Sequence, residues 1–373
     1  MRKKMTRRDF IRSGMFAGLA AGTGCQSASS CCRSIPSWAD VRIEDAVSRY
    51  RWWRGDDLVV SFVFMTDVHS FMLERSVVPD YSDSRYHVLF AQEAADRLNC
   101  DFMVDGGDHD FENLVTSKDE ALRRLEVSKS FYDGYRNRPS LFCMGNHDHG
   151  PEIGGTRPVS SSLFGDAFNG IAEGNGFKVC FGRDRSFGYY DIPEKRFRAV
   201  FVNTSDEGYE GLSVEQLRFV EKALISVPER WSVAVFGHIC VMDEIGHWKR
   251  SQKGQTGLAR KAGFISVLER FVRLRPNDFV GYFCGDSHFD NAFELNGVNY
   301  TISQGFGGCD EIDVPWGARR APSFDRNIPG TFARETLFEI VGVKPEKHIF
   351  KMFRVGAGGS IYDRQCLYAN AMV

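Results

Sequence analysis

Five short polar clusters, each at the end of an apolar run, hold most of the residues in this sequence that could do chemistry. Their donor groups are carboxylates, imidazoles and one amide, the ligand set of borderline divalent transition metals. One ion rarely takes seven such ligands, whereas two ions that share a carboxylate would. The sequence therefore predicts a dinuclear metal site. Its candidate ligands are Asp67, His69, Asp108, Asn146, His238, Asp286 and His288.

The spacing within the clusters supports this interpretation. Asp67 and His69 are two residues apart, so at the end of an extended strand both side chains lie on one face. The same holds for Asp286 and His288. Asn146 offers a neutral carbonyl oxygen as a ligand, and the neighbouring His147 is then free to meet a substrate.

Each cluster alone has an ordinary explanation. A single Asp-x-His or Gly-Asp occurs by chance in many chains, and Gly-His after a strand could be a hydrogen-bonded core histidine. Five such clusters, all at the ends of apolar runs, favour a site. A glycine opens four of them and allows tight backbone turns there.

The elements that must position these clusters alternate along the first half of the chain. Apolar runs that predict strands precede the clusters, at 58–64, 101–104, 140–144, 232–236 and 279–284. Helical spacing occurs at 85–99, 117–135, 213–226 and 258–274, with Ser213 as an N-cap and Gln216 three residues later. Further strand-like runs occur at 186–192, 198–203, 291–295, 298–303, 336–341 and 348–355. Strand ends converge at one edge of a sheet, so a mixed α/β fold with two packed sheets could assemble the site.

The N-terminus predicts export. Arg7 and Arg8 are followed by a short, weakly apolar run, which is typical of a bacterial twin-arginine signal; an ordinary basic amphipathic start is the alternative. Cys25 is either a lipid-attachment site or part of an unmodified tether. We expect the twin-arginine export machinery as a partner, and a periplasmic or envelope-anchored protein. The predicted organisation is a signal and tether at 1–33 and one domain at 41–373, with a motif core at 58–310 and a strand-rich part at 311–373.

Composition narrows the function classes. The 373 residues are 43% hydrophobic, which is enough for a large core. The net charge of −2 comes without a long basic stripe, so no specific nucleic-acid partner is expected.

The ordered motifs DxH, GD, GNHD, GH and GDSH resemble those of the calcineurin-like metallophosphoesterases, which include purple acid phosphatases and cyclic-nucleotide phosphodiesterases. The resemblance extends over 58–288. It implies a four-layer αββα sandwich of two mixed β-sheets flanked by helices. It also implies hydrolysis of phosphate monoesters or diesters by a bridging hydroxide.

The resemblance assigns roles to the donors. Asp67, His69 and His288 would hold one ion, and Asn146, His238 and Asp286 the other. Asp108 would bridge the two ions, and His147 would act as the acid or as a donor to the phosphoryl oxygen. The carboxylate-rich set favours Mn²⁺ or iron, with Zn²⁺, Ni²⁺ or Ca²⁺ as alternatives.

Three positions depart from the family pattern. Asp286 stands where the family has a histidine ligand, and Ile239-Cys240 follows the Gly-His motif in place of the common His-Pro. Phe111 stands where many members carry the carboxylate that orients the catalytic histidine, for which Asp110 or Asp148 are the substitutes. These departures keep open a catalytically weakened metal- or ligand-binding envelope protein of the same fold. A purely structural surface protein would leave the motifs unexplained.

Substrate contacts are predicted from position alone. His109 and His149 flank the motif residues, and Arg319 and Arg320 lie in a long glycine-rich stretch at 303–327. A solvent-exposed role is the alternative for all four.

Overall fold

Two β-sheets packed against each other carry the strands whose ends hold the polar clusters. The computed structural model describes residues 35, 37–70, 84–110, 115–206, 211–240, 255–287, 290–303, 305, 337–356 and 359–368. The predicted signal and tether, Cys25, Phe111, His288, Arg319 and Arg320 lie outside these residues. The described residues from Ser37 onward belong to one compact unit, which contains both sheets.

The first sheet has six strands in the order β13-β12-β11-β1-β2-β3. The strands β1, β2 and β3 run parallel, and β11, β12 and β13 extend the sheet in antiparallel fashion. Their bounds are β1 Val60–Met65, β2 Phe102–Asp105, β3 Ser140–Phe142, β11 Leu337–Lys344, β12 Ile349–Gly356 and β13 Arg364–Leu367.

The second sheet has seven strands in the order β4-β5-β6-β7-β8-β10-β9. Its centre, from β6 to β10, is parallel, and the outer strands β5 and β9 pair in antiparallel fashion. The strands are β4 Val179–Phe181, β5 Gly188–Ile192, β6 Phe197–Phe201, β7 Ser232–Phe236, β8 Phe279–Cys284, β9 Asn291–Leu295 and β10 Val298–Ile302.

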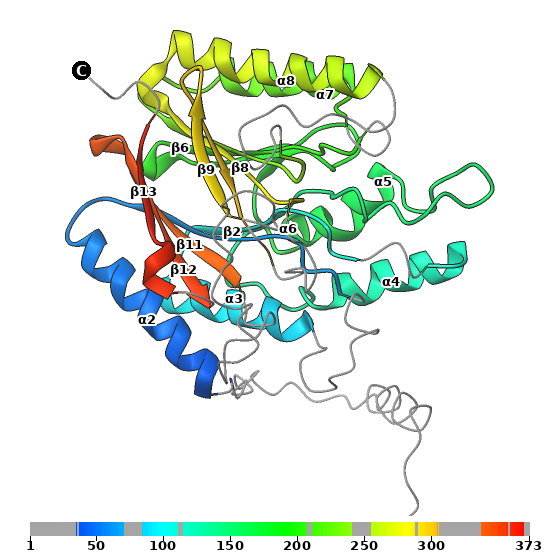
Figure 1. Ribbon diagram of the computed structural model, residues 1–373, viewed down its shortest axis with the longest axis horizontal. Coiled ribbons are helices and arrows are strands. Elements are labelled where there is room, and N and C mark those ends of the chain that lie inside the picture. The colour runs from blue at the N-terminus through cyan, green and yellow to red at the C-terminus, as the bar shows by residue number, and fades with distance from the viewer. Residues whose placement is uncertain are drawn as a thin grey trace, which may run out of the picture. The chain divides into compact units, whose positions relative to one another are not determined.

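Helices cover the outer faces of both sheets (Figure 1). The helices α2 and α3 contact the six-stranded sheet, and α7 and α8 contact the seven-stranded sheet. The bounds are α2 Ser37–Arg54, α3 Ser84–Leu98, α4 Lys118–Ser130, α5 Ser161–Phe164, α6 Gly170–Gly174, α7 Val214–Ile225 and α8 Gln255–Leu274, with a π-turn at Gly165–Asn169 and short 3-10 turns at Pro193–Lys195, Pro276–Asp278, Pro345–Lys347 and Gly359–Tyr362. The predicted sandwich of two mixed sheets flanked by helices is confirmed.

In the described part of the chain, no helix has both the length and the apolarity to cross a membrane.

The interior between the sheets is aromatic. The rings of Phe62 and Phe102 stack with centroids 4.9 Å apart, and Phe62 meets Phe236 of the opposite sheet edge-on at 5.3 Å. Phe236 in turn stacks on Phe283 at 5.4 Å. Every residue of β1 is buried, because one face of the strand lies in this layer and the other lies under helices. These buried strands hold the loops at their ends in fixed positions.

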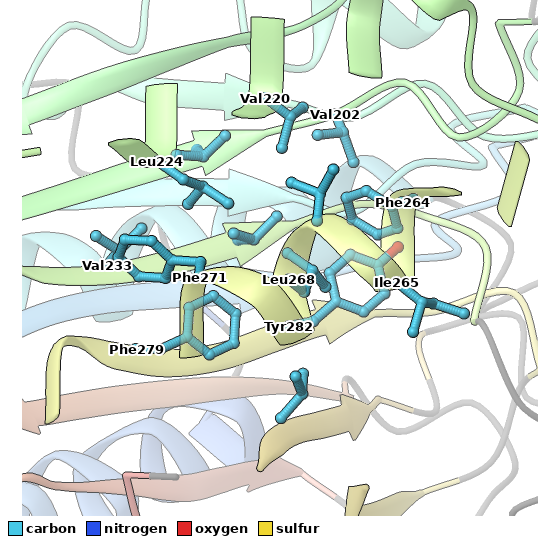
Figure 2. Packing of buried hydrophobic residues seen from close by; sticks show 14 of the residues in the cluster. Val202, Val220, Leu224, Val233, Phe264, Ile265, Leu268, Phe271, Phe279 and Tyr282 are labelled. Carbon is cyan, nitrogen blue, oxygen red and sulfur yellow. The ribbon is translucent and has the colours of Figure 1, made fainter. Parts of the chain in front are cut away.

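A second core lies between the seven-stranded sheet and its two helices. Figure 2 shows Val220 of α7 beside Val202, with Leu224 one turn farther along the same helix, and Leu268 of α8 next to Tyr282 of the sheet. Ser213 caps α7 as predicted, accepting a hydrogen bond of 3.2 Å from the Gln216 amide. The Gln216 side chain is not part of a capping box, because it pairs with both backbone groups of Asn203, beyond the end of β6.

The structure contains several elements that the sequence did not predict, among them the short helices α5 and α6 and the edge strand β13. The helix α2 begins at Ser37, in the segment that the sequence assigned neither to the tether nor to the domain. The edge strand β4 is also new, since its three residues are too few to show a period.

A buried ionic group joins the two sheets. Glu339 of β11 accepts a 2.7 Å hydrogen bond from Arg354 Nε of β12. Arg354 Nη2 also lies 2.5 Å from Asp290, which directly precedes β9 in the other sheet. Glu339 and Arg354 are each 1% exposed.

Replacing Glu339 with Ala should lower the free energy of unfolding by about 3–5 kcal/mol, because it removes one partner of a buried charge. Urea unfolding would measure this change. The matched control is Glu346→Ala, whose side chain is 78% exposed beside Arg196 and should change stability by no more than about 0.5 kcal/mol. Equal stabilities of the two variants would contradict the role of Glu339 as a stabilising partner of the buried Arg354.

Candidate metal centre

The five polar clusters meet at one edge of the sandwich. Three follow β1, β2 and β3 of the six-stranded sheet, and two follow β7 and β8 of the other. Backbone hydrogen bonds link the loops: Asp67 N to Gly107 O at 2.8 Å, and Gly285 N to His238 O at 2.9 Å. The convergence expected from strand order is therefore present for the described clusters.

Asp108 occupies the middle of this group. Its Oδ2 lies 3.1 Å from His238 Nε2, 3.7 Å from His69 Nε2 and 3.9 Å from His147 Nε2. Asp67, His69 and Asp108 place ligand atoms within 4.8 Å of one another, and all three are buried. Donors bound at about 2.1 Å to one ion lie about 3–4 Å apart, so these distances suit shared coordination.

The rings of His69 and His238 are oriented with Nε2 toward Asp108 and Nδ1 toward the backbone. His69 Nδ1 lies 2.9 Å from the Asp110 carbonyl oxygen, and His238 Nδ1 lies 2.9 Å from that of Gly106. A carbonyl only accepts, so each Nδ1 carries a proton, and Nε2, which faces Asp108, is the nitrogen that could bind an ion once it has lost any proton of its own. Orientation of a histidine by a backbone carbonyl is the usual arrangement behind a metal ligand.

Asn146 gives an independent sign that a cation fits. Its side chain is 1% exposed, and its Oδ1 accepts no hydrogen bond from any residue that the structure describes. A buried acceptor left in this way is uncommon and calls for a partner such as an ion. Asp286 completes the second half of the set, with Oδ1 3.9 Å from His238 Nε2. The described residues therefore fit a divalent cation, with Asn146 and Asp286 as further oxygen donors at the same edge.

Charge couples these groups. Burial alone would raise the pKa of Asp108, but the facing His238 and His147 hold it well below its usual range. Burial likewise opposes the charged form of His238, yet Asp108 outweighs it and raises the pKa of His238 to about 9. An ion at His238 Nε2 must displace that proton, so metal binding should weaken as the pH falls.

Four of the candidate ligands have a left-handed backbone. The φ angles are +55° at Asp67, +44° at His69, +56° at Asp108 and +67° at Asp286. Residues other than glycine seldom adopt this region, and each costs about 1–3 kcal/mol unless the surroundings enforce it. Strained backbone conformations are concentrated at functional sites, so they support the assignment of a functional site here independently of the residue types.

Gly145 has no room for a side chain. A Cβ there would lie 2.1 Å from Asp108 Oδ1 and 2.2 Å from Asp108 N. Gly145→Ala should therefore displace the Asp108 carboxylate and weaken Mn²⁺ binding about 10–100-fold, which titration calorimetry would measure. The control Gly170→Ala, with nothing within 4 Å of its Cβ, should bind Mn²⁺ as the parent chain does. Unchanged affinity in Gly145→Ala would show that Asp108 is not a ligand.

Comparison with solved structures shows which proteins share this fold. A dimetal phosphatase from Danio rerio is 15% identical, with a TM-score of 0.54, over 84% of this chain and 100% of that chain. The chain has the calcineurin-like metallophosphoesterase fold. A purple acid phosphatase from yellow lupin (Lupinus luteus) is 14% identical with a TM-score of 0.48, over 80% of this chain and 52% of that one. No family model and no curated protein matches the sequence.

Within this metallophosphoesterase fold, His147 is the described donor nearest to solvent. Its side chain is 18% exposed, whereas those of Asp108, His69 and His238 are at most 1% exposed. The backbone N–H of His147 donates to Asp108 Oδ1 at 2.9 Å, which fixes the position of this residue beside the centre.

Two predicted substrate contacts need correction. His109 is 2% exposed and lies beneath the centre, where Nδ1 is 3.0 Å from Asp148. Burial disfavours its charged ring, but Asp105 and Asp148 outweigh this and raise the pKa of His109 to about 9. His149 is 6% exposed, with Nδ1 2.9 Å from Val159 O and Nε2 2.7 Å from Ser205 O. Neither ring faces solvent, so neither is placed to touch a substrate.

Asp110 and Asp148 were suggested as the carboxylate that orients the catalytic histidine, but the structure shows other partners for both. Asp148 accepts backbone hydrogen bonds from residues 108–110 and 145. The Asp110 carboxylate lies 3.6 Å from Arg124 Nη1.

Sequence reasoning missed Arg157. The segment after His149 folds back on it, because Val159 N donates to His149 O at 3.1 Å. This return brings Arg157 Nη1 to 3.5 Å from the backbone carbonyl oxygen of Asn146. No local motif marks Arg157, and only the fold of the loop brings it to the site.

Proposed function

We propose that this chain is a metal-dependent hydrolase of phosphate esters that uses a dinuclear site and is exported to the cell envelope. The observation that carries the proposal is the single Asp108 oxygen facing three imidazole Nε2 atoms. The shared fold supports it. The export part rests on the twin-arginine pattern around Arg7 and Arg8.

In this proposal Asp67 and His69, with His288, hold one ion. Asn146, His238 and Asp286 hold the other, and Asp108 is shared. Two divalent ions there would lower the pKa of a water and neutralise charge on the phosphoryl oxygens. The three aspartates make the set rich in hard oxygen donors, so Mn²⁺ or iron is the expected occupant.

His147 has the catalytic role in this scheme. Its ring is held beside Asp108 yet remains partly open to solvent, where an ester oxygen could meet it. A histidine in this position can donate a proton to the leaving alkoxide.

The test is hydrolysis by the chain without residues 1–33. The substrates are p-nitrophenyl phosphate and bis-p-nitrophenyl phosphate, each with Mn²⁺, Fe²⁺, Zn²⁺, Ni²⁺ or Ca²⁺. Metal-dependent turnover with two ions bound per chain is expected, and the preferred ester separates a monoesterase from a diesterase. No turnover with any metal, and fewer than two ions bound, would favour the binding-protein alternative that Asp286 keeps open.

Arg157 should favour doubly charged substrates. Replacing it with Met should raise KM for the monoester dianion about 10–100-fold and that for the diester monoanion less, because a charged hydrogen bond contributes about 1.5–3 kcal/mol. Steady-state kinetics on both esters would check this. Arg183→Met, at a side chain 82% exposed beside Glu215, is the matched control and should leave both KM values unchanged. Equal changes for the two esters would remove Arg157 from the substrate site.

A further inference from the structure

One carboxylate beneath the centre binds the backbone of two ligand loops. Asp148 is 5% exposed. Its Oδ1 accepts from His109 N at 2.7 Å and from Asp110 N at 3.2 Å. Its Oδ2 accepts from Asp108 N at 3.1 Å and from Gly145 N at 2.8 Å. Four backbone donors from two loops thus meet a single side chain.

The left-handed turn at Asp108 explains this convergence. A residue with φ near +56° turns successive N–H groups to one side and forms an anion-binding concavity. Such concavities usually hold a phosphate or another external anion, but here the anion is a side chain of the same chain. The hydrogen bonds to Asp148 stabilise the backbone conformation that Asp108 would otherwise avoid.

The loops after β2 and β3 each accept hydrogen bonds from the backbone of the other. Asp148, from the loop after β3, holds the backbone of Asp108, and the Asp108 Oδ1 accepts from His147 N at 2.9 Å. This leaves Asp108 Oδ2 to face the imidazoles. Each loop therefore fixes the other, as the two partners of a capping box do at a helix end.

A buried polar chain supports Asp148 from behind. His109 lies between Asp148, 3.0 Å from its Nδ1, and Asp105, 3.4 Å from its Nε2. The Tyr132 hydroxyl donates to Asp105. The His109 ring packs 4.4 Å from that of Phe168, and this apolar surrounding strengthens each polar contact.

We propose that Asp148 is a positioning residue that holds the Asp108 carboxylate in its metal-binding geometry by filling the concavity formed by the amides of residues 108–110. The inference rests on the proposed function in taking Asp108 as a ligand shared by two metal ions.

The test removes the Asp148 carboxylate by substitution and then supplies a carboxylate from solution. Asp148→Ala should weaken Mn²⁺ binding about 10–100-fold in calorimetry and reduce the exchange-coupled two-Mn²⁺ signal in electron paramagnetic resonance. Formate, which carries the missing carboxylate, should restore both in a saturable way. It should not do so in the parent chain or in Asp166→Ala, whose side chain is 63% exposed. A variant that stays folded but gains no affinity from formate would overturn the inference, as would Asp148→Ala with parental affinity.

A second variant and a second measurement test the inference even if Asp148→Ala does not fold. If Asp148→Ala does not fold, Asp148→Asn keeps one acceptor oxygen and turns an amide donor toward the remaining N–H groups. Asp148→Asn should show a smaller loss of Mn²⁺ affinity, and parental affinity in this variant would overturn the inference.

Hydrogen exchange of the Asp108 and Gly145 backbone amides needs no metal or substrate. It should accelerate in either variant, and unchanged exchange would overturn the inference too. A chain that binds two Mn²⁺ ions without turnover would refute the proposed function and leave the role of Asp148 standing.

Discussion

Asp108→Asn should lower metal-dependent kcat/KM by at least about 10³-fold, the largest effect expected of a single substitution in this chain. A shared carboxylate contributes several kcal/mol of charge stabilisation through its ions, and about 4 kcal/mol corresponds to that factor. The amide keeps the size of the side chain but removes the charge that faces His238 and His147. Kinetics with p-nitrophenyl phosphate, together with metal analysis of the purified variant, would measure the loss.

The control for this prediction is Asp45→Asn. That side chain is 56% exposed on α2 and pairs only with Arg49 among the contacts that the structure describes, so activity should remain at the parental level. An Asp108→Asn variant that kept two ions and kcat/KM within tenfold of the parent would show that the bridging role is wrong.

His147→Ala should lower kcat by about 10²–10⁴-fold while two ions stay bound, because a positioned acid contributes to the chemical step and not to metal affinity. The loss should be larger for phenyl phosphate than for p-nitrophenyl phosphate, since a good leaving group needs less protonation. The backbone N–H of His147 that donates to Asp108 is retained in the alanine variant.

His147→Gln separates the two roles assigned to this residue. Glutamine can donate a hydrogen bond but cannot transfer a proton under these conditions, so it should match His147→Ala if the residue is an acid. Recovery of most of the rate by Gln would instead make His147 a donor to the phosphoryl oxygen. Equal losses for the two leaving groups would also argue against proton donation.

The strand ends that converge could be predicted from the sequence, because buried strands and glycine-led polar clusters leave clear local patterns; the assignment of the residues there as metal ligands stays a prediction. The sequence did not predict the burial of His109 and His149. Both stand in the same motifs as real candidates, and sequence adjacency does not show toward which side of a loop a ring turns. The hydrogen bonds of Asp148 were missed for a related reason, since its partners at 108–110 lie about forty residues away.

Other features follow only from the three-dimensional fold. The left-handed backbone at Asp67, His69 and Asp108 is enforced by contacts between loops, and neither aspartate nor histidine requires it locally. The Arg354 contact with Asp290 spans 64 positions in the chain. Arg157 reaches Asn146 only because the segment between them folds back. Tertiary contacts, and not local propensity, decide these positions.

The split origin of the donors has a thermodynamic consequence. Asp67, Asp108 and Asn146 come from loops of one sheet, whereas His238 and Asp286 come from loops of the other. Ions held by both sets would cross-link the sandwich at its open edge, so occupancy and folding become one linked equilibrium. A ligand present at a hundred times its Kd adds about 2.7 kcal/mol to the folded state. The depth of the phenylalanine layer between the sheets would then set how far apart the two half-sites stand, and so which ions the protein can retain.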